Sequence, residues 1–360
     1  MIAYITEALL YLCYAVIVGT LMMKVIPETQ RPTITVPWPV LLAAVLGIPI
    51  LSFVPVYKIT LFYQEAFQTD FWTIFYDVLF DVSVGTAWLW VLGFSAALLM
   101  ILGLPVFRED KATPYVGLLL MLILIGWFGW GSHTKSLYEW PGFLTHTVHF
   151  LTVIVWIGLL MVTAWFSSST SNWPRFLKWF SPLSIACVGA AIAAGFILSA
   201  YLAPEYMNSW MVPYGQALLI KHILIIPLLA LAFVNGFVLP RRMKGNNSFN
   251  PIPWLKAESM IAFGTFIITA IMGQQDPPHD VRLFLKEAPP SSLFTSIYPG
   301  QFSPDMTISL GMHVTGIILA ACSMILLLLI VRSKGKSSFT LIYSLLFTVS
   351  TYFSVMFSIR

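Results

Sequence analysis

The sequence has few charged residues and few cysteines for its length. Of its 360 residues, only 9% are Asp, Glu, Lys or Arg, whereas 58% are hydrophobic. A soluble globular domain carries about 25% charged residues, so this composition excludes that class. The three cysteines, Cys13, Cys187 and Cys322, are scattered and form no C-x-x-C pair. The sequence therefore indicates neither a disulfide framework nor a cysteine metal site.

The chain also lacks the short motifs of several enzyme classes. It contains no G-x-x-x-x-G-K-[ST] phosphate loop, no G-x-G-x-x-G after a strand and no H-E-x-x-H. These absences argue against an ATP-driven pump and against a soluble-type hydrolase.

Long apolar segments make up most of the chain. A membrane-spanning helix needs about 20 mostly apolar residues, and unsatisfied backbone groups in lipid require such segments to be helical. We therefore expect an all-α, polytopic membrane helical bundle of about ten transmembrane helices in a cytoplasmic (inner or plasma) membrane. The expected spans are Ala3–Met23, Val36–Val56, Val84–Leu104, Pro114–Gly131, Pro141–Phe166, Pro182–Ala203, Gly215–Leu239, Ala257–Gln275, Asp305–Val331 and Phe339–Ser358.

Basic residues are concentrated in alternate loops, and this asymmetry predicts the orientation. Loops rich in Lys and Arg face the cytoplasm, which places both termini outside. The net charge of +4 belongs mainly to these loops, so it indicates contact with anionic lipid headgroups and no nucleic-acid partner. The basic residues concerned are Lys24, Arg31, Arg108, Lys111, Arg175, Lys178, Arg241, Arg242, Lys244, Lys256, Arg332, Lys334 and Lys336.

All six histidines fall toward the outer side in this orientation. His133 and His279 lie in outer loops, whereas the others are expected about two turns inside spans at similar depth. Such an arrangement is what a buried metal or haem site would need. The four histidines expected inside spans are His146, His149, His222 and His313.

The fifth expected span carries two of these histidines. His146 and His149 are three residues apart, and Trp156 follows seven residues after His149, so the three share one helix face. Because polar groups inside a membrane are costly, we favour a functional site in which both imidazoles converge on one ion. In the alternative, one histidine bonds to a neighbouring helix and the other reaches the interface.

The seventh and ninth expected spans supply the remaining candidates. His222 is a better metal ligand than the adjacent Lys221, because neutral imidazole binds metals and lysine normally does not. Met306 and His313 are seven residues apart and would share a face, and a thioether beside an imidazole suits Cu(I). Packing is the alternative role for Met306. His279 follows Asp276-Pro-Pro in an outer loop and is a candidate for a weak first metal contact.

Four segments, taken in order, resemble the bacterial CopD family of copper resistance and copper import membrane proteins. They are FYDVLFDVSVGTAWLWVLG, THTVHFLTVIVWIGLLM, YGQALLIKHILIIPLLALAFVNGFVLPRR and ESMIAFGTFIITAIMGQQDPP. The resemblance implies family positions at His149, Trp156, Gly158, Lys221, Asn235, Pro240, Arg241 and Glu258. Leu159 departs from the family, which has a second glycine at this place.

The resemblance also implies a division of the chain. We expect a CopD-like transmembrane domain of eight helices at residues 1–276, an external loop at 277–304, and two additional C-terminal transmembrane helices at 305–360. That loop is either an ordered cap or a mobile lid. Copper would arrive from the medium or from a separate external copper-binding protein of the CopC type.

Two functions from different classes fit these residues. The first is copper transport, with import favoured, through a buried site of His146, His149, His222 and His313. The metal is then Cu(I) by preference, with Met306 and His279 as further ligands. The second is a b-haem membrane oxidoreductase or haem-handling protein in which His149 and His222 are axial ligands.

Overall fold

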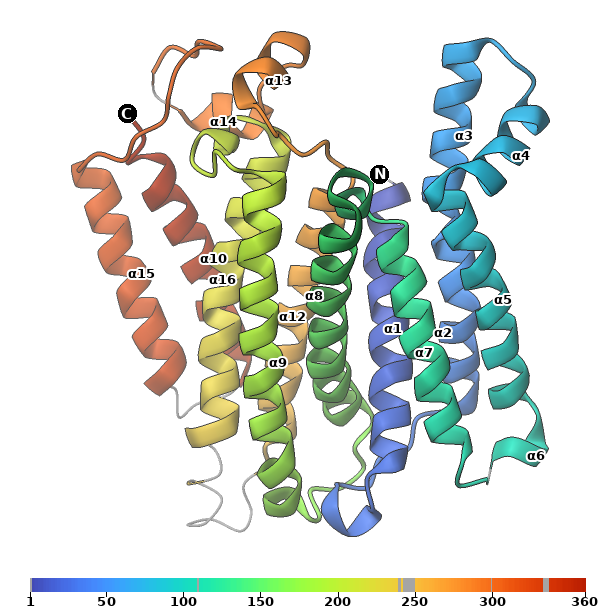
Figure 1. Ribbon diagram of the computed structural model, residues 1–360. Helices are drawn as coiled ribbons and strands as arrows, with labels where there is room; N and C mark the ends of the chain where they lie inside the picture. Colours follow the sequence, from blue (N-terminus) through green and yellow to red (C-terminus); the bar gives the residue numbers. More distant parts are fainter. Residues whose placement is uncertain (1, 109, 239–240, 242–249, 299, 333–336) are drawn as a thin grey trace. The chain divides into compact units, whose positions relative to one another are not determined.

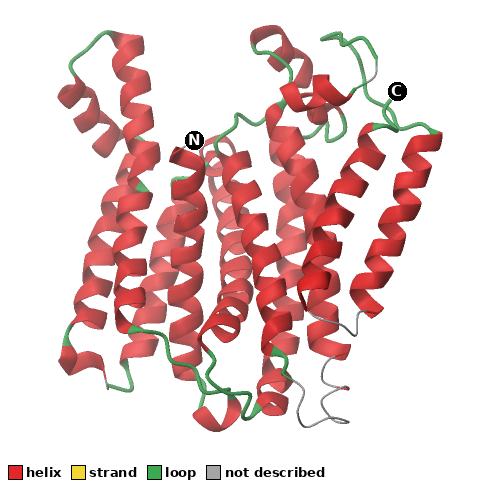
Figure 2. Cartoon of the chain, turned by 180° about the vertical axis from the view of Figure 1, so that it is seen from behind, coloured by secondary structure: helices red, strands yellow, loops and turns green. Residues whose placement is uncertain are grey.

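The computed structural model describes residues 2–108, 110–238, 241, 250–298, 300–332 and 337–360 (Figures 1 and 2). Over these residues it contains helices and two isolated β-bridges, with no strand. Ten helices are long and apolar enough to cross a membrane. The expectation of an all-α, multi-pass membrane bundle is therefore confirmed. Arg242, Lys244, Lys334, Lys336 and Pro240 lie outside the described residues.

Contacts divide the chain into two compact units, Met1–Leu198 and Ser199–Arg360, and each is described by itself. This grouping by contacts differs from the division at residue 276, which rests on the family resemblance and stays a prediction. The first unit contains the first eight α-helices and most of α9. Its elements are α1 (Ile2–Val25), η1 (Glu28–Gln30), α2 (Trp38–Leu51), α3 (Phe53–Phe67), α4 (Phe71–Asp81), α5 (Ser83–Gly103), α6 (Pro105–Arg108), α7 (Thr113–Trp130), α8 (His133–Phe166) and α9 (Trp173–Leu202).

Helices α1 and α8 pack with their backbones in contact. A Cβ atom placed on Gly19 would lie 2.2 Å from the carbonyl oxygen of Gly158, and one on Gly158 would lie 2.4 Å from that of Ala15. Small residues four apart allow such close approach in membranes, where the hydrophobic effect does not drive helices together. Gly158 therefore fixes the position of α8 against α1.

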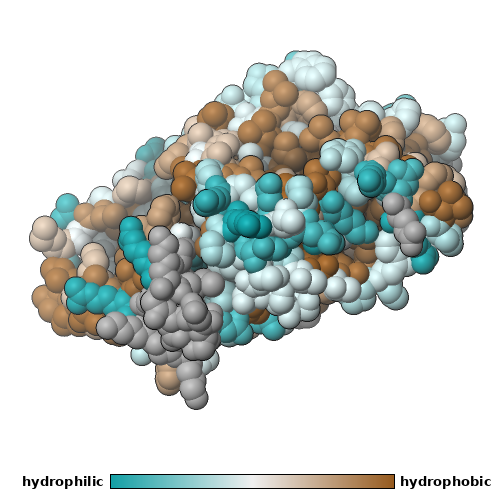
Figure 3. All heavy atoms as spheres, turned by 90° about the horizontal axis from the view of Figure 1, so that it is seen from below, coloured by the Kyte–Doolittle hydropathy of each residue, from teal (hydrophilic) through white to brown (hydrophobic). Residues whose placement is uncertain are grey.

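Basic loops of the first unit meet at one end of its helices. The Thr35 amide donates to the Phe166 carbonyl at 3.0 Å, and Asn172 Nδ2 donates to the Glu28 carbonyl at 3.0 Å. Lys24 and Arg108 both lie over the ring of Trp38, at 5.3 and 4.6 Å. Figure 3 shows the protein from below, and hydrophilic residues gather on part of that face. The loops predicted to be cytoplasmic thus share one end of this unit.

Helix α8 is interrupted near its start. Tyr138 and Glu139 have non-helical backbone angles, with φ of 48° at Glu139, and Pro141 follows. Proline lacks the amide that would continue the helical hydrogen bonds, so a break just before it is expected. The segment after Pro141 is the expected fifth span. His146 and His149 lie in its first two turns or so.

The second unit is built around α10 and α12. Helix α10 packs against α12, α15 and α16, and α12 also packs against α16. The two C-terminal helices therefore belong to the core of this unit. Its elements after α9 are η2 (Asn208–Met211), α10 (Pro213–Phe233), the π-helical turn η3 (Val234–Val238), α12 (Ile252–Gly273), α13 (Val281–Glu287), α14 (Ser292–Ile297), α15 (Val314–Arg332) and α16 (Ser337–Met356).

The described residues of the loop 277–304 form an ordered cap with two short helices, α13 and α14. Phe294 is fully buried and Val281 is 1% exposed. The Ser291 amide donates to the carbonyl of Met211 at 2.8 Å, which ties the cap to η2. Of the two alternatives left open by the sequence, the structure therefore shows the cap.

The ninth span begins later than expected. It starts at Val314 instead of Asp305, and Met306 and His313 precede it in non-helical chain. Leu310 forms an antiparallel bridge with Ile359, and the Gly311 amide donates to the Ser358 carbonyl at 2.7 Å. Pairing with the C-terminal residues thus satisfies backbone groups that a helix would otherwise have used.

Candidate metal-binding residues

His149 is held by a hydrogen bond to the neighbouring helix. Its Nδ1 lies 2.8 Å from the backbone carbonyl oxygen of Ala191 on α9. A carbonyl oxygen can only accept, so Nδ1 carries the proton, and the lone pair of the neutral ring is on Nε2. Metal-binding histidines are commonly oriented in this way, by a carbonyl that accepts from the other ring nitrogen and so fixes the tautomer.

Gly195 provides the space for the His149 ring. A Cβ atom at Gly195 would lie 3.4 Å from His149 Cε1 and 3.6 Å from Nδ1. Ala191 and Gly195 are one helical turn apart, so this face of α9 is small enough for the imidazole to lie against the backbone. Neither residue was predicted as part of the site, although the small residues of Ala190–Gly195 were a visible signal.

His146 lies in an aromatic environment beside α7. Its ring centroid is 5.8 Å from that of Phe128 on α7 and 6.4 Å from that of Phe150. Tyr11 of α1 packs against the same two phenylalanines, at 6.2 and 5.6 Å. Tyr11 also donates a hydrogen bond to the carboxylate of Glu7. Glu7, a half-buried acidic residue in a spanning helix, is a further polar group that the site prediction missed.

Trp156 and Gly158 have structural contacts in this unit. Trp156 is 6% exposed, and Leu159, which replaces the second family glycine, is fully buried. Because Gly158 touches the backbone of α1, the departure at Leu159 leaves the close helix contact intact.

His222 is paired with a tyrosine in the second unit. Tyr206 Oη lies 2.7 Å from His222 Nδ1, and the two rings stack with centroids 5.6 Å apart. Burial raises the pKa of the Tyr206 phenol above its usual value, so the phenol stays neutral at physiological pH. A neutral phenol can donate or accept, so both tautomers of His222 are compatible with this contact. Tyr206 was not among the predicted site residues.

Lys221 and His222 differ in their contacts. Lys221 forms no hydrogen bond or ion pair with any residue that the structure describes, whereas the ring of His222 is fixed by Tyr206. Adjacent residues on a helix point about 100° apart, so the two side chains face different surroundings. This geometry favours His222 as the oriented ligand of the two.

The prediction that His313 lies two turns inside a span is wrong. His313 immediately precedes α15 and is exposed, and Met306 is half-buried in non-helical chain. The expected shared helix face of Met306 and His313 does not exist. His279 is exposed in the loop after α12, as expected for an outer contact. Met211 is 1% exposed and contacts the cap through its carbonyl, which indicates packing.

The predicted ligands are distributed over both units. His146 and His149 belong to the first, whereas His222, His279, Met306 and His313 belong to the second. Within the described ranges, no three His, Cys, Asp or Glu side chains gather closely enough to hold a metal ion. A single site made by the four histidines therefore stays a prediction, and the position of His313 weakens it.

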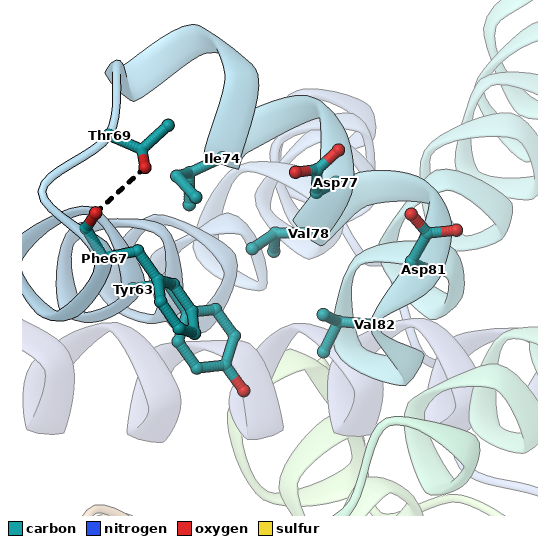
Figure 4. A pocket seen from close by; sticks show the side chains of 8 residues that line it. All are labelled: Tyr63, Phe67, Thr69, Ile74, Asp77, Val78, Asp81 and Val82. Carbon is teal, nitrogen blue, oxygen red and sulfur yellow. Dashed lines mark hydrogen bonds between the residues drawn. The ribbon is translucent and has the colours of Figure 1, made fainter.

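An exposed acidic pair lines a pocket in the first unit (Figure 4). The pocket lies at the hairpin of α3 and α4, where Asp70 caps α4 by accepting from the amides of Trp72 and Thr73. Asp77 and Asp81, one turn apart on α4, line it together with Tyr63 and Val78. Such carboxylates attract cations electrostatically.

The fold and these residues define a class: a multi-pass α-helical membrane protein with oriented histidines inside its spans. Residues 174–272 match the model of the family described as copper resistance protein D, CopD. The resemblance carried by the sequence motifs is thereby confirmed. Neither this description nor the name of the relative below refers to haem.

A curated relative is the copper transport protein CutJ of Bacillus subtilis (strain 168). The two sequences are 22% identical over 218 residues, which cover 56% of this chain and 38% of the relative. The chain thus matches well under half the length of that protein. No solved structure matches the chain.

Proposed function

We propose that this protein transports copper across the membrane, with import as the favoured direction. The observation that carries the proposal is the orientation of His149: its Nδ1 donates to the Ala191 carbonyl, so the lone pair of the neutral ring is on Nε2. The CopD match and the copper transport relative support copper as the substrate. The proposed class is a transporter, with no catalytic residue.

Two histidines are the proposed principal ligands, one in each unit. His149 is oriented by a backbone carbonyl and His222 by a tyrosine. Imidazole suits copper, and Cu(I), the preferred oxidation state, also accepts the soft thioether of methionine. Conduction requires sites that bind strongly enough for entry and weakly enough for release. Ligands that each hold the ion briefly meet this requirement better than a closed four-histidine cage.

The outer face supplies the entrance in this proposal. Asp77 and Asp81 attract the cation, and the exposed His279 makes a weak first contact. A separate external protein of the CopC type is the proposed donor where copper is not taken from the medium. An inside-negative membrane potential favours cation entry by about 2.3 kcal/mol per charge per 100 mV.

The proposal is tested by copper uptake into proteoliposomes that contain the full chain. Cu(I) is kept reduced outside, a potassium diffusion potential sets the inside negative, and lumenal copper is measured against time. We expect uptake by the wild type above that of protein-free vesicles, and background uptake by a His149→Gln, His222→Gln double variant. Wild-type vesicles that accumulate no more copper than protein-free vesicles would reject copper transport.

The haem alternative is tested by the absorption spectrum of the same preparation. Axial ligation by histidine gives an intense Soret band, whereas Cu(I) bound to imidazole gives no such band. We expect copper without a Soret band. A stoichiometric haem spectrum that is lost in His149→Gln would replace transport by the haem function.

A further inference from the structure

A buried carboxyl–amide pair lies in the second unit, apart from the histidines. Asn235 is in the π-helical turn η3, and Glu258 is on α12. Asn235 Nδ2 donates to Glu258 Oε2 at 2.6 Å and to the Trp254 carbonyl at 3.3 Å. The two side chains are only 8% and 3% exposed. π-Helical turns inside helices occur frequently at functional sites.

The amide oxygen of this pair lacks a donor. Both hydrogens of Asn235 Nδ2 are used, whereas Oδ1 is buried and accepts no hydrogen bond. A buried acceptor left unsatisfied keeps its full desolvation penalty, with no hydrogen bond to offset it. A pair that served only to join α10 to α12 would gain nothing from this orphaned atom. A proton on Glu258 would supply the missing donor once the amide turns its oxygen toward the carboxyl.

No described cation neutralises Glu258. The ion pair of Arg31 with Glu28 is in the other unit. On α10, Lys221 and His222 lie roughly 20 Å before Asn235 at 1.5 Å per residue. Lys256 is two positions before Glu258 and so points to another side of α12. None of the other charged or titratable groups described on the neighbouring elements forms a hydrogen bond or ion pair with Glu258. These groups are Arg241 beyond η3, Tyr214 on α10, Cys322 and Arg332 on α15, and Tyr343 and Tyr352 on α16.

An uncompensated carboxylate inside a spanning helix is costly, and such groups mark proton or ion pathways. Carboxylate and amide oxygens are hard ligands that bind Cu(I) poorly. The pair therefore suits a proton better than the proposed substrate. Glu258 lies about 9 Å along α12 from its first residue at 1.5 Å per residue, near the end that the basic loops predict to be cytoplasmic.

We propose that Glu258 and Asn235 form the proton site of a copper–proton exchange. This inference rests on the proposed copper transport. Glu258 takes up a proton from the cytoplasmic side while the protein is empty of copper, and this proton is released to the outer side when the copper cation enters. One positive charge then replaces another, which avoids adding net charge to the apolar interior. Asn235 is a positioning residue that stabilises the charged form of Glu258 by its amide hydrogen bond.

The first test measures proton binding without copper. The carboxylic-acid C=O band of the purified full-length protein is followed by infrared spectroscopy during a pH titration. We expect a band from a buried protonated carboxyl that Glu258→Gln removes and that Glu287→Gln, a change at an exposed carboxyl of the same unit, leaves in place. A wild-type spectrum without this band, or a band retained in Glu258→Gln, would overturn the proton site.

Asn235→Ser is the second variant, because it retains Glu258 if Glu258→Gln fails to fold. It removes the amide donor, so the pH at which the band disappears should shift. A titration identical to that of the wild type would show that Asn235 does not position the carboxyl, and would overturn the paired site.

The second test follows copper and lumenal pH together in proteoliposomes. We expect copper uptake to acidify the outside and make the lumen alkaline in the wild type and in Glu287→Gln, but not in Glu258→Gln. Copper uptake with the same pH change in Glu258→Gln would overturn the exchange while leaving copper transport intact. Absence of copper uptake in the wild type would overturn transport and the exchange together, and the infrared band would still decide whether Glu258 binds a proton.

Discussion

The two units orient their half-buried histidines with partners of different chemistry. In the first, His149 donates to a backbone carbonyl that can only accept. In the second, His222 meets a tyrosine hydroxyl that can donate or accept. The carbonyl fixes one tautomer with a lone pair on Nε2, whereas the phenol allows either. The two histidines look equivalent in the sequence, but only His149 has its metal-binding tautomer fixed by its neighbour.

This difference assigns unequal roles within the proposed transport. A ring with a fixed tautomer needs no rearrangement before it binds copper, so His149 is expected to be the stronger single ligand. His222 has its lone pair on Nε2 only in the tautomer that carries its proton on Nδ1 and donates it to the phenol oxygen. The ring must change tautomer whenever the phenol is the donor, which weakens binding and eases release. Variants of His149 and of the tyrosine beside His222 should therefore differ in how much copper affinity they lose.

The largest effect is expected from His149→Gln. The glutamine amide can still donate to the Ala191 carbonyl, but it removes the imidazole, so folding is retained while the ligand is lost. Loss of an outer-shell partner lowers metal affinity about 10- to 100-fold, and loss of the ligand itself should cost more. Copper affinity is measured by competition with a Cu(I) chelator.

The matched control is His133→Gln, which changes an exposed histidine at the start of the same helix. We expect wild-type affinity for this variant. Equal losses in the two variants would show that the effect is not specific to the oriented ring.

Gly158→Ala should destabilise the first unit through α8. The added methyl group would meet the Ala15 carbonyl at 2.4 Å, and overpacking of this kind costs about 1–3 kcal/mol. Gly189→Ala is the control, because a Cβ atom there has no neighbour within 4 Å. Thermal unfolding in detergent should show a lower Tm only for Gly158→Ala. A Tm unchanged in Gly158→Ala would mean that α1 and α8 do not touch as described.

Tyr206→Phe should weaken copper binding, and less than His149→Gln does. The ring can still stack on His222 while the hydroxyl at 2.7 Å is lost, so an affinity loss of about 10-fold is expected for an outer-shell partner. Tyr298→Phe in the cap serves as the control. If Tyr206→Phe reduced affinity as much as His149→Gln, the two units would not differ as proposed.

His313→Ala is expected to have the smallest effect on bound copper. The residue is exposed before α15, where an imidazole is hydrated and adds little to a buried ligand set. Copper per protein should stay at the wild-type level, measured by mass spectrometry after desalting. A clear loss of metal in this variant would show that His313 reaches the buried ligands.

The fold class followed from the sequence because span length and backbone satisfaction in lipid leave few alternatives. The ninth span was predicted to begin at Asp305, but its helix begins at Val314, and this error has a specific cause. Residues 309–311 pair with residues 358–360, nearly fifty positions away, and no local pattern indicates such a contact. Hydrophobicity identified the span but not where its helix begins.

The site was only partly predictable for the same reason. His149 and His222 were found because imidazoles are rare inside spans. Their partners were missed, since the Ala191 carbonyl lies 42 residues from His149 and carries no side-chain signal. Tyr206 is 16 residues from His222, beyond the short-range helix spacings used to group residues. Helix packing creates both contacts.

Copper is proposed to bind to the Nε2 atom of His149. X-ray absorption of the Cu(I)-loaded protein tests this binding most directly. The wild-type spectrum should contain the multiple-scattering pattern of imidazole. This pattern should lose intensity in His149→Gln and keep it in His133→Gln. An imidazole contribution that is absent from the wild type, or unchanged in His149→Gln, would contradict the account.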